Sequence, residues 1–388
     1  MQLIIGDRAI SKYQSVSVSL KYDAMASPFS ISVYFDPSNS EDRKTFTPGK
    51  FNIAEVKEGN ETLIKGAIIN HGFRAGQTKS LISVGGYSKS GVLNECQTEP
   101  DGNTQFTGLS LRQMAEKLIA PFGLSLTVDS IAASDADSKA QNISPVIDAD
   151  MTIKEFLTTQ ALSKNIVISH TPDGNLLFTR ADTTKQPIYD FSNIYPATSM
   201  DLTFNGAAMH NNIWAVGQAV EGSDNGTQDR SPLRNPYVQT QLDYLGIARN
   251  NLMGLDVVAY STGYRPGVYK QKTGTLSNTS LTARQYLSQE LRNIRLTIRI
   301  NGWTLNGKLV RPNNIVLVQN PELYLYKTSK WFIEQVDLHG DERSQTATLH
   351  CVLPECFTTG DVENIFTGSN LTVPVVEPGA HATITPFI

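Results

Sequence analysis

The fold of this chain is decided by residues 296–357, which read LTIRINGWTLNGKLVRPNNIVLVQNPELYLYKTSKWFIEQVDLHGDERSQTATLHCVLPECF. At the start of this stretch Leu296, Ile298 and Ile300 alternate with polar residues. A period of two is typical of a strand that buries one face. The stretch therefore begins with a predicted strand, and it contains no catalytic constellation.

Turn chemistry divides the rest of this stretch into further strands. Asn-Gly pairs stand at 301–302 and 306–307, and Pro-Asn-Asn stands at 312–314. Asn and Gly tolerate positive φ, so these positions favour tight turns. A polar hairpin is expected at 340–345. The predicted strands cover residues 296–301, 315–318, 331–336 and 347–353, which together indicate a compact β unit.

Composition limits the classes of protein. With 388 residues and roughly 150 residues per domain, we expect two to four domains. Charged residues make up 18% of the chain, below the roughly 25% typical of soluble proteins, which suits a β-rich protein with large subunit contacts. The net charge is −4 and no Lys/Arg cluster occurs, which argues against a protein that grips nucleic acid through phosphates.

The cysteines and the apolar runs point to no special chemistry. Cys96, Cys351 and Cys356 show no CxxC spacing, and Cys351 alternates with polar residues as a buried small hydrophobe would. No apolar run approaches the eighteen or so residues that a membrane span requires, and the first ten residues lack a basic leader. We expect neither a membrane span nor a signal peptide.

Residues 1–106 are predicted to form the N-terminal part of a first β-barrel domain. Apolar residues alternate with polar ones over 15–22 and again over 29–35. Residues 37–50 are expected to form a polar loop. Gly85-Gly86 interrupts a later strand, which indicates a bulge or a close backbone approach, because no helix follows that would form a phosphate-binding loop.

An internal repeat follows the first β section. Ser110 with Gln113, and Thr152 with Glu155, each have the spacing of a capping box. In that motif a hydroxyl and a side chain three residues later satisfy the first free amides of a helix. Both sites therefore predict a helix start.

The two repeat copies also end alike. Gly123 and Asn165 suit the left-handed position that follows a helix, and a short apolar strand comes after each. Residues 171–174, Thr-Pro-Asp-Gly, predict a turn into a further strand. Residues 107–185 are thus expected to form a small α+β insert of two helix-strand units.

The remaining sections complete the expected organisation. Residues 186–220 are predicted to complete the first barrel after the insert, and a polar linker opens the next section. Residues 221–357 are predicted to form a second β-barrel domain with one helix over 281–294. Residues 358–388, which carry three prolines and little periodicity, are expected to form an extended arm.

Paired carboxylates are the best candidates for catalysis, because glycoside hydrolysis needs only two of them. The closest pairs are Asp148 with Asp150 and Asp135 with Asp137. The first pair precedes a predicted helix, where carboxylates complement the helix dipole, and the second is expected in a polar loop. Structural roles are therefore favoured for both pairs.

Two further clusters carry charge without a clear site. His339, Asp341 and Glu342 fall in the predicted hairpin, where polar residues are expected anyway. Arginines at 292, 295 and 299 could line a nucleic-acid path, but interface or solvated roles are favoured. We assign no catalytic, cofactor-binding or metal-ligating residue, and we do not expect an enzyme.

The order of these motifs resembles the baseplate hub proteins of contractile phage tails. The resemblance is to the Mu-like group, with related hubs in T4-like phages and in the hub part of type VI secretion spikes. It covers nearly the whole chain. The matching residues are 86–90 (GYSKS), 93–96 (LNEC), the helix and PFGL turn within 109–124, NGKLVRPNN at 306–314, and the strands 316–318, 331–336 and 349–357. At the position of Asn94-Glu95 the family more often has Val-Asp. This difference concerns packing and not a functional site.

This resemblance implies a homotrimer in which each chain supplies two similar β-barrels, so that three chains form a pseudo-sixfold ring. Such a ring adapts a sixfold tail tube protein to a threefold spike protein and contacts other baseplate proteins. DNA would pass through its lumen without specific binding. The expected location is the virion tail baseplate, after synthesis in the bacterial host cytoplasm, and no cofactor is implied.

Two rival functions remain open from the sequence. One is a hub that also carries peptidoglycan-lytic activity, with Asp148 or Asp150 as its candidate carboxylates. The other is a monomeric carbohydrate-binding module for host recognition. The oligomeric state, turbidity loss of peptidoglycan and glycan binding distinguish the three.

Overall fold

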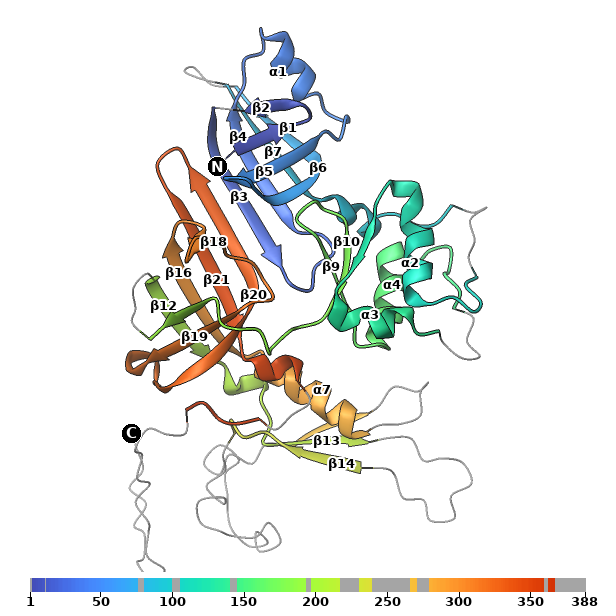
Figure 1. Ribbon diagram of the computed structural model, residues 1–388, viewed down its shortest axis with the longest axis vertical. Helices are drawn as coiled ribbons and strands as arrows, with labels where there is room; N and C mark the ends of the chain where they lie inside the picture. The colour runs from blue at the N-terminus through green and yellow to red at the C-terminus, as the bar shows by residue number, and fades with distance from the viewer. Residues whose placement is uncertain are drawn as a thin grey trace, which may run out of the picture.

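The computed structural model describes residues 2–10, 12–75, 80–99, 105–139, 145–192, 197–216, 230–238, 266–270, 279–358 and 362–366. A large, mainly antiparallel sheet runs along the molecule, and an α+β unit lies beside it (Figure 1). A smaller sheet with one helix lies at the lower end of the same view. The fold is thus β-rich α+β, as the sequence predicted.

The N-terminal half of the large sheet is built from seven strands in one continuous stretch of chain. The strands are β1 (Gln2–Ile5), β2 (Arg8–Ile10), β3 (Tyr13–Lys21), β4 (Pro28–Tyr34), β5 (Ile53–Glu58), β6 (Glu61–Arg74) and β7 (Leu81–Ser88). Their order is β3-β4-β7-β6-β5-β1-β2. Apolar residues alternate along β3 and β4, so one face of each strand is buried, as expected.

The C-terminal half is built from strands on both sides of a long stretch of sequence. It contains β11 (Tyr189–Phe191), β12 (Ala197–Phe204), β16 (Ile294–Asn301), β19 (Ile315–Asn320), β20 (Leu325–Asp341) and β21 (Gln345–Val352). The order is β12-β16-β21-β20, and β19 pairs with both β20 and β11. A short hairpin, β17 (Thr304–Leu305) with β18 (Lys308–Leu309), lies between β16 and β19.

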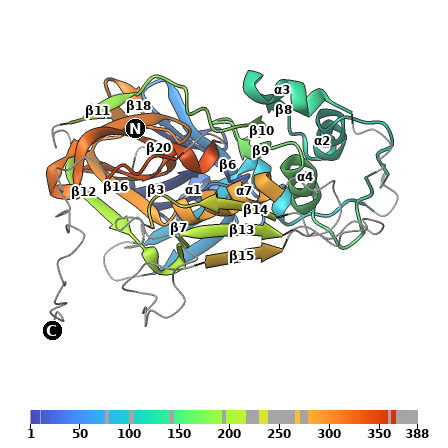
Figure 2. The same cartoon turned by 90° about the horizontal axis from the view of Figure 1, so that it is seen from below.

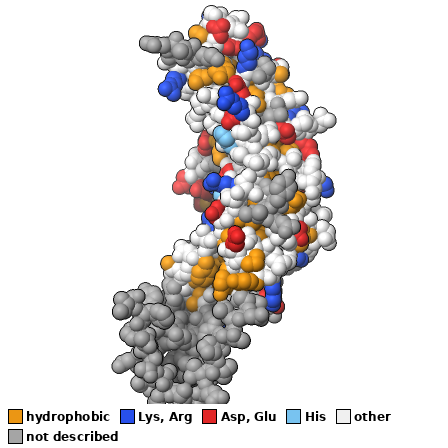
Figure 3. Space-filling view, turned by 90° about the vertical axis from the view of Figure 1, so that its left-hand side faces the viewer, with side chains coloured by type: hydrophobic (Ala, Val, Ile, Leu, Met, Phe, Trp, Pro, Cys, Tyr) orange, Lys and Arg blue, Asp and Glu red, His pale blue; other side chains and the backbone are white. Residues whose placement is uncertain are grey.

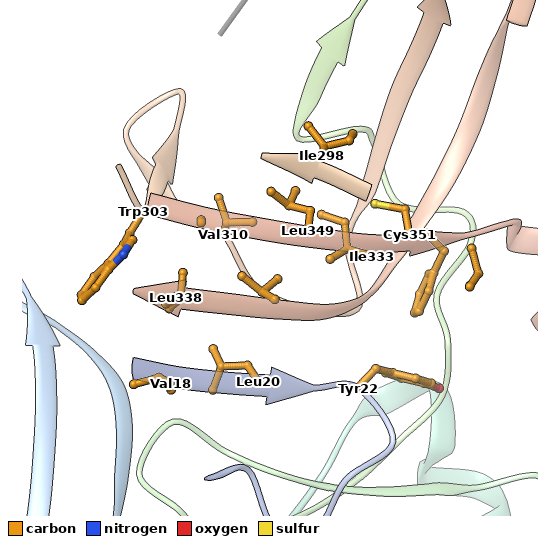
Figure 4. Packing of buried hydrophobic residues seen from close by; sticks show 14 of the residues in the cluster. Val18, Leu20, Tyr22, Ile298, Trp303, Val310, Ile333, Leu338, Leu349 and Cys351 are labelled. Atoms are coloured by element: carbon orange, nitrogen blue, oxygen red, sulfur yellow. The ribbon is translucent and has the colours of Figure 1, made fainter. Parts of the chain in front are cut away.

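The two halves are joined by pairing between β20 and β3. Leu338 lies opposite Val18, and Val336 lies opposite Leu20. Figure 4 shows buried side chains of β3, β20 and β21 following one another across this junction. The buried residues of both halves belong to one hydrophobic cluster, so the sheet has a single continuous core.

The segment from 186 to 220 was predicted to complete the first β unit, and this is wrong. Tyr189–Phe191 pairs in parallel with β19, and Ala197–Phe204 pairs antiparallel with β16. Both partners belong to the C-terminal half. Alternation in a strand shows which face is buried but not which strand it pairs with, so the sequence could not choose the partner.

The Gly85-Gly86 pair allows a close backbone approach, as predicted. A β-carbon built on Gly86 would lie 1.8 Å from the carbonyl oxygen of Ala67 and 2.8 Å from the ring of Phe29. The register between β6 and β7 also shifts opposite this pair, between Ile68 and Asn70. A side chain at 86 would therefore force the two strands apart.

The insert confirms the predicted capping boxes. Helices α2 (Leu111–Ile119) and α4 (Ile153–Leu162) begin after Ser110 and Thr152, and both reciprocal hydrogen-bond pairs are present. Gly123 and Asn165 have φ of 63° and 52°, the left-handed conformation expected of them. The short strands follow as β8 (Leu126–Val128), β9 (Val167–His170) and β10 (Leu176–Thr179), with β10 parallel to β8 and antiparallel to β9.

Two helices occupy segments that were predicted as polar loops. Helix α3 (Ser130–Asp137) buries Ala132 and Ala136, and α1 (Ser40–Thr45) begins after an Asn39 cap. Both helices are short and rich in polar residues, so their apolar periodicity is weak. The insert packs its three helices around its own hydrophobic cluster, separate from that of the sheet.

The lower end of the molecule holds the smaller sheet. Strands β14 (Arg230–Arg234), β13 (Asn212–Val216) and β15 (Pro266–Lys270) pair in this order, and α7 (Thr279–Leu291) lies against them (Figure 2). The helix confirms the one predicted in this section, although Ile294 already belongs to β16. Most of the predicted linker and most of the C-terminal arm lie outside the described residues.

Short 3-10 helices link several of these elements. They are η1 (Lys89–Asn94), η2 (Ala120–Phe122), η3 (Gly206–Ala208), η5 (Pro321–Leu323) and η6 (Pro354–Phe357). None of the helices in the described ranges is long and apolar enough to cross a membrane.

Candidate functional site

One face of the large sheet is polar across both halves of the molecule. In each strand the residues that alternate with the buried ones lie on this face, and the register aligns them in rows. One row runs through Asn301, Thr346, His339, Ser17, Ser30, Gly85 and Asn70, from β16 to β6. The row crosses the β20–β3 junction without a break.

Three further rows complete this surface, which we call the polar face. They are Asp201, Thr297, His350, Gln335 and Lys21; Ser199, Arg299, Thr348, Asp337 and Ser19; and Asp341, Ser15, Ser32, Ser83 and Gly72. Serine and threonine are the commonest residues in the four rows. The alternate residues point into the core, so the sheet separates a hydroxyl-rich surface from an apolar interior.

Charges on the polar face are few and balanced. Its acidic side chains are Asp201, Asp337 and Asp341, and its basic side chains are Lys21 and Arg299. Arg295, at the end of β16, adds a third basic side chain just beyond the four rows. Figure 3 shows the molecule from the left-hand side of Figure 1, where basic and acidic side chains are scattered among white ones. Neither sign forms a continuous area in that view.

A hydrogen-bonded cluster sits where the two halves of the polar face meet. Asp337 on β20 lies 2.8 Å from His350 Nε2 on β21, and Gln335 Nε2 donates to both Asp337 and Ser19 of β3. Burial opposes ionisation of Asp337. Hydrogen bonds from His350, Ser19 and Gln335 outweigh that effect and lower the pKa of Asp337 to about 2. The cluster therefore holds an ionised carboxylate and links the halves.

The candidate catalytic carboxylates occupy structural positions. Asp148 and Asp150 are exposed in the segment before α4. Asp135 pairs with Arg180 at 2.6 Å, and Asp137 pairs with Arg112, so both tie α3 to its neighbours. They lie on a helix rather than in the predicted loop. The ion pairs give both α3 carboxylates a role in packing the insert.

The residues of the possible metal cluster have separate roles. His339 and Asp341 both lie on the polar face, two positions apart on β20. Asp341 accepts hydrogen bonds from Arg343 N and Ser344 N and so closes the turn after the strand. Within the described ranges no group of three or more His, Cys, Asp or Glu residues could hold a metal ion.

The three arginines have two different surroundings. Arg292 pairs with Glu334 at 2.9 Å and lies over the ring of Phe357. This contact anchors the end of α7 to the large sheet. Arg295 and Arg299 are exposed on β16, so two of the three reach the polar face.

The cysteines are free thiols, and two of them are buried. Burial raises the pKa of the Cys351 thiol far above its usual range and that of Cys356 to about 12. A thiol that stays protonated is a poor nucleophile and a poor metal ligand. The prediction that Cys351 is a small buried hydrophobe is confirmed.

A buried polar cluster behind the C-terminal half was missed in the sequence. Glu290 on α7 accepts hydrogen bonds from His210 N and from Asn235 Nδ2, and it lies 2.7 Å from His210 Nδ1. The only signal for Glu290 in the sequence is its place in a weakly amphipathic helix. Its partners His210 and Asn235 lie in distant segments, and sequence spacing does not relate them to this helix.

Comparison with known proteins gives one curated relative of note. No family model matches the chain. The chain is 23% identical over 349 residues to the baseplate hub protein gp44 of Escherichia phage Mu, and the match covers 85% of this chain and 81% of that protein.

Solved structures share the fold at lower identity. The 43 kDa tail protein of prophage MuSo2 from Shewanella oneidensis has a TM-score of 0.71 and 18% identity, covering 92% of this chain and 99% of its own. A tail protein from Neisseria meningitidis MC58 has a TM-score of 0.68 and 16% identity, covering 92% and 97%.

A more distant structure extends the fold to secretion systems. The E. coli c3393 protein, a component of the type VI secretion system, has a TM-score of 0.53 and 9% identity, covering 91% of this chain and 77% of its own. The resemblance noted in the sequence is thus confirmed. The chain is similar over most of its length to the Mu baseplate hub protein gp44, and it shares the fold of solved phage tail proteins.

Proposed function

We propose that this chain is the structural baseplate hub of a contractile phage tail. Its similarity to the Mu hub protein extends over most of both chains, and its fold matches the tail protein of prophage MuSo2 and a tail protein from Neisseria meningitidis MC58. In this role it forms a homotrimer and carries out no catalytic step. Its place is the tail baseplate of the virion, after synthesis in the host cytoplasm.

The polar face is the observation that carries this proposal. A sheet that buries one side and presents unbroken polar rows on the other is suited to forming a wall. Three copies arranged about an axis, each with two β units joined through β20 and β3, would present six units to the lumen. The two halves would then act as the two similar barrels of each chain.

The division of labour among the sections follows from this arrangement. Residues 1–106 would form the first barrel unit, and residues 221–357 with strands β11 and β12 would form the second. The insert at 107–185 would lie outside the wall, since it packs beside the sheet (Figure 1). Residues 358–388 would form an arm toward a neighbour. The two barrel units would match a sixfold tail tube protein, and the trimer would match a threefold spike protein beside other baseplate proteins.

The chemistry of the polar face suits passage of DNA without capture. Affinity for DNA grows with the number of phosphates that basic side chains neutralise. Here the three basic side chains are balanced by three acidic ones, and the remaining positions are mainly hydroxyls and amides. A lumen with this lining would stay hydrated and would not hold the phosphate backbone.

The mass of the purified protein in solution tests the proposal. Light scattering coupled to size exclusion is expected to give three chains per particle at micromolar concentration. A monomer under these conditions would remove the basis for a ring. A change in DNA affinity with salt then tests the lumen: we expect weak binding with a shallow salt dependence.

A further inference from the structure

A cavity of about 270 Å³ lies where the insert meets both halves of the large sheet. Its walls come from the end of β3, from the β9–β10 hairpin of the insert, and from the loop that precedes β19. The residues that line it include Lys21, Tyr22, His170, Lys185, Arg311 and Asn313. The proposed hub function makes no use of this cavity.

The cavity is basic. Lys21, Lys185 and Arg311 line it, and no carboxylate does. Acids outside the wall act on its residues: Glu61 on Arg311, Asp182 on Lys185, and Asp23 and Asp129 on Tyr22. The cavity therefore combines three positive side chains with no matching negative one.

Arg311 is half-buried, and the protein accepts few of its N–H donors. Among the described residues its one hydrogen bond runs from Nη2 to the carbonyl oxygen of Thr62, at 2.6 Å. Burial lowers the pKa of Arg311, and the opposing effect of Glu61 only partly offsets it. A guanidinium has five N–H donors, so most of its donor capacity is available to a ligand.

A second buried donor in the wall lacks a partner. Tyr22 is 3% exposed, and its hydroxyl makes no hydrogen bond in the structure. Figure 4 shows its ring reaching beyond the end of β3. A buried hydroxyl without a partner is costly, and each such group in a folded protein calls for an explanation.

Lys185 adds a cation that is already positioned. Its Nζ donates to the carbonyl oxygen of Asn313 at 2.9 Å, and the Asn313 side chain in turn contacts Arg180 O and Asp182 N. This network ties the insert to the loop before β19. The ammonium keeps two further N–H donors.

We propose that this cavity is a binding site for a small oxyanion, a phosphate or a carboxylate group. The anion would accept hydrogen bonds from Arg311 and Lys185 and would offset the charge that the cavity concentrates. Since the walls belong to the insert and to both halves of the sheet, a bound anion would fix the three parts against one another.

Titration calorimetry on the purified full chain tests this site. Inorganic phosphate and acetate serve as separate probes, at millimolar concentrations and constant ionic strength. We expect saturable binding of at least one probe. Lys185→Gln is expected to weaken it about tenfold, because a charge-assisted hydrogen bond is lost. Lys154→Gln, an exposed lysine of α4, is the matched control and should leave binding unchanged.

Arg311→Gln gives the larger expected loss, about tenfold or more. Arg311 also holds Thr62, so the thermal midpoint of each variant is measured alongside. Lys185 is exposed, so its variant is expected to keep the fold. If phosphate binds more tightly than acetate, the natural ligand is a free phosphate. If acetate binds more tightly, the natural ligand is a carboxylate side chain. The proposal is overturned if neither probe saturates, or if Lys185→Gln binds as the unchanged protein does.

Discussion

The large sheet and the insert are stabilised in opposite ways. The sheet joins strands that lie far apart in the sequence, such as β3 and β20, into one core. The insert builds a separate core from one continuous stretch, with two capped helices and short strands. The difference teaches that the wall of the proposed ring is a single cooperative unit, while the insert is a local module attached to its side.

Removing a side chain at the β20–β3 junction tests the cooperativity of the sheet. Phe332 is fully buried, and its ring contacts Tyr22 and Phe357. Phe332→Ala is expected to lower the free energy of unfolding by about 3–5 kcal/mol, because a large cavity opens in the shared core. Urea unfolding with amide exchange should show lost protection in β3 as well as in β21. Loss confined to the C-terminal half would contradict one continuous core.

The matching change in the insert should act locally. Leu157 is fully buried in the insert cluster. Leu157→Ala is expected to cost about 2–5 kcal/mol within the insert, again through a cavity. Amide exchange should quicken in α2 and α4 while β3, β20 and β21 keep their protection. Equal loss in the sheet would mean that the two cores unfold together.

The glycine pair of β7 sharpens the picture of the N-terminal half. Gly86→Ala would place a methyl group 1.8 Å from Ala67 O, so we expect about 1–3 kcal/mol of destabilisation or more. Gly85→Ala is the matched control, since its added carbon would lie 3.6 Å from Phe29 O, an ordinary contact. Thermal unfolding of both variants measures the difference. Equal midpoints would show that the close approach does not constrain the sheet.

The helix caps test the local character of the insert. Ser110 accepts a hydrogen bond from Gln113 N and starts α2. Ser110→Ala is expected to destabilise the insert by about 1 kcal/mol, because the first amides of the helix lose their acceptor. Ser110→Asp serves as the control, since aspartate is also a good cap. Circular dichroism during urea unfolding measures the stability of both variants. If Ser110→Asp lost as much stability as Ser110→Ala, capping would not explain the effect.

The Asp337 cluster gives the smallest effect and a pH dependence. The pKa of Asp337 is about 2 in the folded protein and 3.8 in an unperturbed carboxyl, so the ionised form stabilises the fold. This contribution is present above about pH 4 and is lost as pH falls through 2. Because the side chain is 40% exposed, we expect at most about 1 kcal/mol.

Asp337→Asn should therefore have a lower free energy of unfolding at pH 7. Between pH 5 and 2 its free energy of unfolding should fall less than that of the unchanged protein. Asp201→Asn, an exposed acid on the same face, is the control and should stay within about 0.5 kcal/mol. Urea midpoints across this pH range measure both. A steeper acid loss in Asp337→Asn would give the opposite sign and refute the account.

The contrast between sheet and insert also explains what the sequence could predict. The caps at Ser110 and Thr152 and the turns at Gly123 and Asn165 depend on neighbours within a few residues, so their pattern predicts them directly. The pairing of β12 with β16 depends on residues about a hundred positions apart, and alternation does not select a partner. For that reason residues 186–220 were assigned to the wrong half.

The candidate site shows the same limit. Each strand of the polar face was readable as alternating, yet the rows that cross β20 and β3 exist only once the register is known. The cluster of Asp337, His350, Gln335 and Ser19 and the cavity around Arg311 likewise join distant segments. Sequence spacing predicts strands well and assembled surfaces poorly.

Electron microscopy of the purified protein, viewed along its symmetry axis, tests the central claim most directly. We predict a threefold ring with six β lobes whose lumen is lined by the polar face, with Ser17 and Thr348 toward the axis and the insert on the outside. A particle without threefold symmetry, or a ring in which this face points outward, would contradict the account.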